Sequence, residues 1–132
     1  HENLRNSFPT AFDWLDSQID TIQKDIGKDY FGRPRNFKDK PYRMRNFSVQ
    51  APSSIFCLER LVALHKDLRE IDAQICFNVH DGYGLVCTKN SYLETYEVAK
   101  KSLESESKLL PGLKVPVECQ MGFNLIQMKT MK

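Results

Sequence analysis

The stretch NVHDGYGLVC, residues 78–87, places a histidine and an aspartate, His80 and Asp81, between two apolar, strand-like runs. A carboxylate is a ligand that magnesium prefers, and the tip of a β-hairpin would hold it rigidly over open space. An Asp-Gly pair is also common in hairpin turns for reasons of backbone conformation alone. The stretch by itself therefore leaves two roles open for Asp81, turn residue or metal ligand.

Positive charge is concentrated in residues 28–45, KDYFGRPRNFKDKPYRMR, which hold seven Lys or Arg against two Asp. The local charge is +5 (7 − 2) in a chain whose net charge is only +2. Such an asymmetry is typical of a surface that meets a polyanion, and a solvated basic loop is the alternative. Nucleic-acid binding is thus a hypothesis that rests on the position of the charge and not on its total.

The 132 residues are enough for one domain with a modest hydrophobic core. None of the four cysteines forms a C-x-x-C pair, so a zinc site is not expected. Each lies in an apolar run, which predicts buried thiols in a reducing compartment. The sequence has no apolar stretch as long as a membrane span and no signal-peptide pattern. We therefore expect an intracellular, cytoplasmic protein with no membrane partner.

Two long segments of the first half have helical periodicity. Residues 8–26 predict an amphipathic helix with Pro9 in its first turn. Residues 42–70 predict helix as well, which Pro52 should break, kink or begin anew. Between these segments, FGRPRNF predicts a short hairpin or looped excursion that pushes two guanidinium groups, those of Arg33 and Arg35, outward at its tip.

The second half alternates strands and a helix. Residues 73–80 predict a strand with Ile75, Phe77 and Val79 on one face, and LVCT returns after the HDGYG turn. Residues 91–107 predict a helix, and KVPVECQMGF predicts a last strand. This order predicts an α+β fold, in which a small antiparallel sheet of the β-hairpin plus the C-terminal strand has helices packed on one face.

Four stretches in this order resemble the C-terminal palm segment of family A DNA polymerases, the DNA polymerase I type. FGRPRNF resembles the family's GRRR element, and RNFSVQAPSS resembles its duplex-binding helix, R-x-x-x-N-x-P-x-Q-G-x-A-A. VHDGYGLVC resembles its VHDE palm turn, and VPVECQMGFNL resembles its closing VPL-x-V-x-x-G-x-N-W. The resemblance implies that residues 1–132 are a single partial domain, a palm segment with its duplex-binding helix, which completes a larger polymerase chain.

The resemblance also implies roles for individual residues. Asp81 matches the aspartate that binds the catalytic Mg²⁺ ions, and His80 matches a histidine near the primer terminus, so both are expected to be catalytic. Asn46 and Gln50 match a polar pair that reads the minor groove of the primer–template duplex. The GRRR match and the rest of the basic run add four expected contacts to the DNA backbone, Arg33, Arg35, Arg43 and Arg45.

The chain departs from the family pattern in ways that bear on activity. Gly82 replaces the glutamate after the His-Asp pair, Leu125 replaces the final tryptophan, and Ala-Pro-Ser-Ser follows Gln50. The sequence contains neither the family's first palm carboxylate motif nor its fingers helix. Nucleotidyl transfer of this kind needs two metal ions about 4 Å apart, and one aspartate cannot hold both.

We therefore expect a subunit or fragment of a split, DNA-directed DNA polymerase of phage or viral origin that is inactive alone. A larger chain would supply the other carboxylate and the fingers, with primer–template DNA, deoxynucleoside triphosphates and Mg²⁺. The chain alone should then expose an apolar patch where the larger chain covers it. One alternative is a catalytically decayed palm that serves as a DNA-binding or assembly module. The other is a fragment of a single-subunit RNA polymerase, because HDGYG also resembles the HDS-F-G turn of those enzymes.

Overall fold

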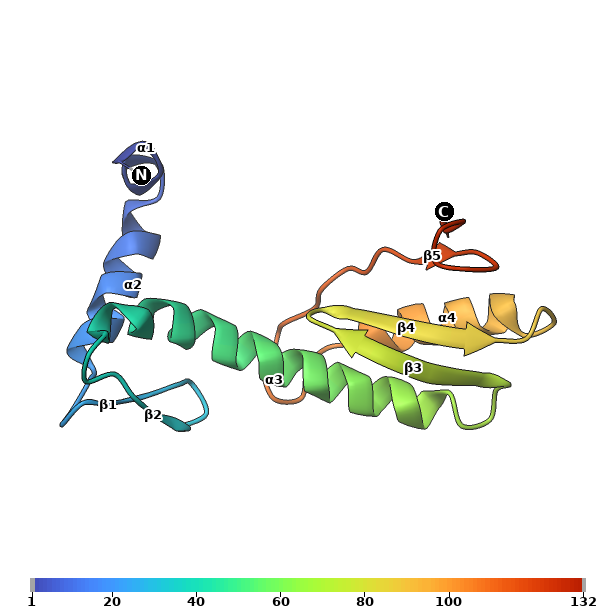
Figure 1. Cartoon of the computed structure of the whole chain (residues 1–132), viewed down its shortest axis with the longest axis horizontal. Coiled ribbons are helices and arrows are strands. Elements are labelled where there is room, and N and C mark those ends of the chain that lie inside the picture. The colour runs from blue at the N-terminus through green and yellow to red at the C-terminus, as the bar shows by residue number, and fades with distance from the viewer. Residues whose placement is uncertain (1, 132) are drawn as a thin grey trace. The chain divides into compact units, whose positions relative to one another are not determined.

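The computed structural model describes residues 2–131 and divides the chain into two compact units, with the division between Ile55 and Phe56. Helices alternate with two-stranded antiparallel sheets, which confirms the predicted α+β class (Figure 1). The elements are α1 (Glu2–Ser7), α2 (Pro9–Asp20), β1 (Ile26–Lys28), β2 (Pro34–Asn36), the 3-10 helix η1 (Pro41–Arg43), α3 (Met44–Asp67), β3 (Ala73–Val79), β4 (Gly82–Cys87), α4 (Tyr92–Leu103), β5 (Gln120–Met121) and β6 (Lys129–Thr130).

The first unit is built around the β1–β2 hairpin. A short hairpin or looped excursion was predicted here with Gly-Arg-Pro-Arg at its tip, but the loop is residues 29–33, and Pro34 and Arg35 lie in β2. Phe37 and Met44 are buried at the centre of the unit, and Phe47 packs edge-on against Phe37 with ring centroids 5.5 Å apart. Gly27 in β1 approaches this pair so closely that a Cβ atom there would lie 2.6 Å from the Met44 sulfur. Glycine is required at this position because any side chain would displace the buried centre.

The first predicted helix is shorter than expected. α2 begins with its proline in the first turn, as predicted, but it ends at Asp20 instead of residue 26. The chain then turns back through Lys24 and Asp25, which have φ values of 49° and 67°. The residues on either side, Gln23 and Ile26, exchange two backbone hydrogen bonds of 2.9 Å. Two consecutive left-handed residues make this a type I′ turn, which directs the chain into β1.

Helix α3 runs without a break through Pro52, so the proline neither ends it nor begins a new helix. Proline has no N–H group to donate to the carbonyl of Ser48, one turn earlier. Two serine hydroxyls on either side of the proline bond back to carbonyls of their own helix. Ser48 Oγ donates to Met44 O and Ser53 Oγ donates to Val49 O, each over 2.8 Å.

The second unit has a core between the end of α3, helix α4 and one face of the β3–β4 hairpin. Leu64 of α3 and Leu68, directly after this helix, are buried against Ala99 and Leu103 of α4. The hairpin contributes partly buried side chains from both of its strands to the same core. The strand residues of this core are Ala73, Ile75, Tyr83 and Leu85. This arrangement confirms that helices pack on one face of the hairpin.

A β-bulge at Cys76 overturns the prediction that Ile75, Phe77 and Val79 share a face. Ile75 pairs with Leu85, but the register shifts by one residue and Phe77 then pairs with Gly84. Side chains of paired residues point to the same face of a sheet, and one extra residue reverses the alternation beyond it. Phe77 and Val79 therefore face away from the helices and are 44% and 57% exposed. The prediction of four buried thiols is wrong as well, because Cys76 is exposed and the other three cysteines are only half-buried.

The C-terminal strand differs from the prediction as well. It was expected to extend the sheet of the β-hairpin, but β5 pairs only with β6, with Gln120 opposite Thr130. Residues 114–119, directly before β5, belong to no helix or strand. Pro116 within this segment has no N–H group for a ladder hydrogen bond, which disfavours pairing there.

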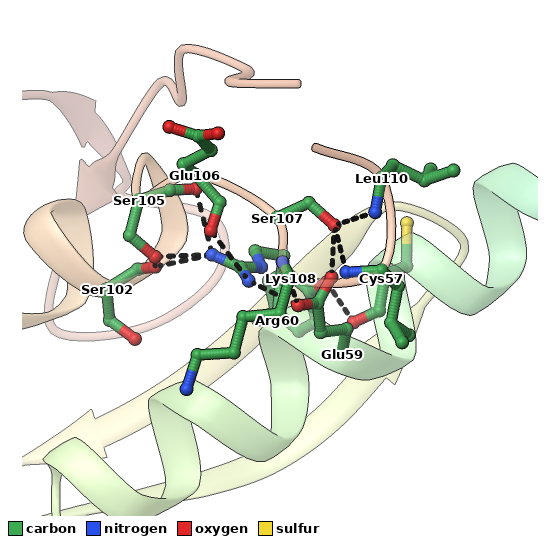
Figure 2. A network of polar contacts seen from close by, with 11 residues as sticks. Cys57, Glu59, Arg60, Ser102, Ser105, Glu106, Ser107, Lys108 and Leu110 are labelled. Atoms are coloured by element: carbon green, nitrogen blue, oxygen red, sulfur yellow. Dashed lines mark hydrogen bonds and ion pairs between the residues drawn. The ribbon is translucent and has the colours of Figure 1, made fainter. Parts of the chain in front are cut away.

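A buried arginine joins α3 to the end of α4 (Figure 2). Arg60 is 3% exposed, and its Nη1 donates to the carbonyls of Ser102 and Ser105 over 3.3 and 2.9 Å and to the Ser105 hydroxyl. These groups end α4, where a cation also interacts favourably with the helix dipole. The charge of Arg60 is balanced by Glu59, whose Oε1 lies 3.0 Å from Nη2.

Glu59 extends the same network to the segment that follows α4. Its carboxylate accepts hydrogen bonds from the Ser107 hydroxyl and, over 2.7 Å, from the Lys108 backbone N–H (Figure 2). Burial alone would raise the pKa of Glu59, but these two bonds and the charge of Arg60 outweigh it and hold the pKa below its usual value. The carboxylate therefore stays ionised and keeps the segment attached to α3.

Within residues 2–131, no helix is long and apolar enough to cross a lipid bilayer.

Replacing Arg60 with alanine should strongly destabilise the second unit. The change leaves the carbonyls at the end of α4 and the Glu59 carboxylate without their buried partner, which typically costs about 3–5 kcal/mol. Urea unfolding followed by far-UV circular dichroism should show the loss. Arg69→Ala, at an exposed position just after α3, is the matched control and should change stability by less than about 0.5 kcal/mol. Equal stability of the two variants would contradict a structural role for Arg60.

Candidate functional site

His80 and Asp81 are the two central residues of the β3–β4 turn, because Val79 pairs directly with Gly82. The sequence placed the turn at HDGYG, and the structure narrows it to these two residues. His80 has a φ of 53°, and the positive φ is confined to this first central residue, as in a type II′ turn. Both side chains are exposed and make no hydrogen bond or ion pair within residues 2–131. The carboxylate of Asp81 is therefore presented to the surroundings from a tight turn.

Two side chains fix the turn to the rest of its unit. Asn78 Nδ2 donates to the carbonyl of Gly82 over 3.1 Å, across the base of the turn. Tyr83, which pairs with Asn78, donates its hydroxyl to the backbone carbonyl of Cys57 in α3 over 2.6 Å. Burial, the neighbouring Cys57 and the negative charge of Asp81 raise the pKa of Tyr83. The phenol stays protonated and able to donate this bond.

A complete metal site is not formed by the described residues. Within residues 2–131, no group of three or more His, Cys, Asp or Glu side chains is close enough to hold a metal ion. Asp81 supplies one carboxylate. Of the two residues next to it in the sequence, His80 and Gly82, His80 alone has a side chain that can bind a metal ion. Magnesium would need further oxygen ligands from substrate, water or a second chain.

Arg33 is not the free guanidinium that the sequence predicted at the hairpin tip. Its Nε donates to Asp29 Oδ2 over 2.7 Å, and its Nη2 donates to the carbonyl of Ala51 in α3 over 2.9 Å. Asp29 also accepts the backbone N–H groups of Phe31 and Arg33, over 3.0 and 2.9 Å. Burial would raise the pKa of Asp29, but these bonds and the charge of Arg33 hold it below its usual value. Arg33 thus ties the hairpin to α3.

Arg35 lies in β2, opposite Gly27, and not at the hairpin tip where the sequence predicted it, but its guanidinium stays available. Its guanidinium lies over the rings of Phe37 and Phe47, 5.9 and 5.5 Å from their centroids, and it forms no ion pair within residues 2–131. Stacking on two rings positions the cation while leaving its N–H groups free. It lines a surface hollow of about 240 Å³ together with three further cations and one acidic residue, Lys38, Lys40, Arg43 and Asp39.

The other expected DNA contacts divide into engaged and free side chains. Arg45 forms an ion pair with Asp16 of α2 over 2.7 Å, so much of its charge is already compensated. Asn46 and Gln50 lie in α3, are exposed, and make no hydrogen bond through their side chains within residues 2–131. They lie four residues apart and so share one helix face, as expected.

The structure therefore brings Arg35 and Arg43 together in one hollow, while Asp81 and His80 lie in the other unit. Sequence reasoning noted the basic run but did not single out Lys38 and Lys40, whose positions depend on the loop between β2 and η1. It also missed Asp29, although an acidic residue four positions before Arg33 is a visible signal for an ion pair.

Neither the scan of protein-family models nor the search of curated proteins finds a match to this chain.

Replacing Tyr83 with phenylalanine should lower the free energy of unfolding by about 1 kcal/mol near neutral pH, the usual worth of one hydrogen bond. The raised pKa of Tyr83 makes this difference depend on pH. The folded protein keeps the phenolic proton that the unfolded chain loses above its ordinary pKa of 10.0, so the contribution falls as pH rises past that value. Urea unfolding at about pH 9 and about pH 11 should show the difference shrinking toward zero. A constant difference would contradict a half-buried phenol that donates this bond.

Proposed function

We propose that this chain is the C-terminal palm segment of a split family A DNA polymerase and that Asp81 is one ligand of its catalytic magnesium ions. The observation that carries the proposal is the β3–β4 turn. It presents an unpaired carboxylate from a two-residue turn whose base is fixed by Asn78 and Tyr83. A rigid, exposed and unneutralised carboxylate is what a two-metal site requires of one ligand.

The exposed apolar side chains support a covering partner. The outer face of the β3–β4 hairpin carries Phe77, Val79 and Val86, which are 44%, 57% and 61% exposed. On α3, Leu58 and Val62 are also more than half exposed. A hairpin that is apolar on both faces is typical of a strand pair inside a larger layered structure. In this proposal the second chain covers these residues and supplies the missing carboxylate and the nucleotide-binding cations.

The first unit would hold the primer–template duplex. Arg35, Arg43 and the two lysines of the hollow would contact phosphates, which gives affinity without sequence preference. Asn46 and Gln50, with their amides free on one face of α3, would donate to acceptors that all base pairs display in the minor groove. Arg33 would act through structure, because its guanidinium is occupied by Asp29 and Ala51.

The decisive experiment is primer extension by the chain purified together with whatever polymerase chain stays bound to it, with Mg²⁺ and deoxynucleoside triphosphates. Asp81→Ala should reduce extension by at least about 100-fold, since removing one group that stabilises the developing charge typically costs this much. Asp72→Ala, which changes an exposed aspartate at the other end of the hairpin, is the matched control and should extend normally. Equal extension by wild type and Asp81→Ala would refute the proposal.

A second function, a DNA-binding module without catalysis, is favoured by the hollow of four cations and the single carboxylate. It predicts duplex binding that depends on salt but not on magnesium. The double variant Arg35→Ala/Arg43→Ala should lower the slope of log affinity against log salt by about 2, close to one unit for each phosphate contact. Lys66→Ala/Arg69→Ala removes the same charge from exposed positions elsewhere and should leave the slope unchanged. Binding assays at several salt concentrations, each with and without Mg²⁺, would measure it.

A further inference from the structure

The first unit contains a second hollow, separate in its lining residues from the basic one, with a volume of about 310 Å³. Trp14 of α2 and Tyr30 of the β1–β2 loop line it, and these rings are 48% and 69% exposed. Large aromatic rings normally stabilise a fold by being buried. Here two of them remain in contact with solvent at the same hollow, on a helix, α2, that has no buried residue. Their exposure is better explained by a ligand than by the fold.

Polar groups complete the wall. Gln18 lies in α2, Thr21 directly follows this helix, and Ser48 lies in α3. Gln18 donates its amide nitrogen to the Trp14 carbonyl over 3.3 Å, which leaves its amide oxygen without a partner among residues 2–131. Thr21 Oγ1 donates to the Gln18 carbonyl over 2.7 Å and Ser48 Oγ to the Met44 carbonyl over 2.8 Å. These hydroxyl oxygens and the Gln18 amide oxygen therefore offer acceptors to the amino or ring N–H groups on the edge of a planar heterocycle.

The charges of the hollow favour an anionic ligand. Lys28 lines it and forms no ion pair within residues 2–131. Asp29 also lines it, but its two oxygens are occupied by Arg33 and by backbone N–H groups, so its charge is compensated from within. One free cation beside two aromatic rings corresponds to a base and its phosphate.

We infer that this hollow binds an unpaired base of a single-stranded nucleic acid, with the base stacked against Trp14 and Tyr30 and its phosphate near Lys28. Stacking of this kind tolerates any base, because every base has a π-face. A base within a duplex is covered on both faces, so the ligand must be a single strand such as a template overhang. The inference rests on the proposed function only in taking nucleic acid as the ligand, and it involves neither Asp81 nor metal ions.

Trp14 is the only tryptophan of the chain, so its fluorescence reports on this hollow directly. The full chain would be titrated with a short single-stranded oligothymidylate and with an oligonucleotide of equal length built from abasic units. Stacking should quench the fluorescence with the first ligand and leave it unchanged with the second. Equal quenching by both, or binding without any change in fluorescence, would show that only the phosphates are recognised and would overturn the inference. The absence of any binding would overturn it too.

Tyr30→Ala should raise the Kd for oligothymidylate about tenfold, within the range expected for one stacked base. Tyr42→Ala is the matched control, because Tyr42 is also an exposed tyrosine of this unit, 56% accessible, but does not line the hollow. Equal effects of the two variants would overturn the inference. If Tyr30→Ala binds normally while Asp81→Ala abolishes primer extension, the base-binding hollow is refuted and the polymerase proposal stands. The reverse pattern refutes the polymerase proposal alone.

Discussion

The bulge at Cys76 determines which side chains of the β3–β4 hairpin meet the helices and which meet the surroundings. Before the bulge, Ile75 and its partner Leu85 face the core. After it, the alternation is reversed, so Asn78 pairs with the inward Tyr83 and Phe77 turns outward over Gly84. A Cβ atom at Gly84 would lie only 2.2 Å from the Phe77 ring, so the glycine is what lets the ring lie flat across the sheet. One inserted residue thus places the hydrogen-bonding Asn78 and Tyr83 on one face and the apolar Phe77 on the other.

The hydrogen bond from Tyr83 to α3 has a counterpart in the first unit. In each unit, a side chain of the hairpin donates to a backbone carbonyl of α3. In the first unit this donor is Arg33, bonded to Ala51, and in the second it is Tyr83, bonded to Cys57. Both donors also neighbour a carboxylate. Arg33 is paired with the buried Asp29, which is thereby neutralised, whereas Asp81 beside Tyr83 is exposed and has no ion-pair partner within residues 2–131. The same construction therefore yields a structural ion pair in one hairpin and a free carboxylate in the other.

Several local elements of the fold could be predicted from the conformational preferences of single residues. Pro9 lies in the first turn of α2, as predicted, because its missing N–H group would have no partner at that position. The bulge could not be predicted in the same way, because Ile75, Phe77 and Val79 alternate as an uninterrupted strand would. The shift depends on contacts with Gly84 and the core that lie outside the strand itself. The role of each arginine was hidden for the same reason, since charge alone does not distinguish the paired Arg33 and Arg45 from the stacked Arg35.

The outward apolar surface and the isolated carboxylate have a single explanation if both belong to a larger assembly. An exposed Phe77 costs the chain the free energy that its burial would provide, roughly 1.5–3 kcal/mol for such a side chain. The Asp81 side chain makes no hydrogen bond or ion pair within residues 2–131 that would stabilise the turn. The partner proposed above would cover the apolar face and add ligands beside the turn, which would account for both features. The bulge links them physically, because the shift that turns Phe77 and Val79 toward such a partner also brings Asn78 opposite Tyr83 and so fixes the turn that carries Asp81.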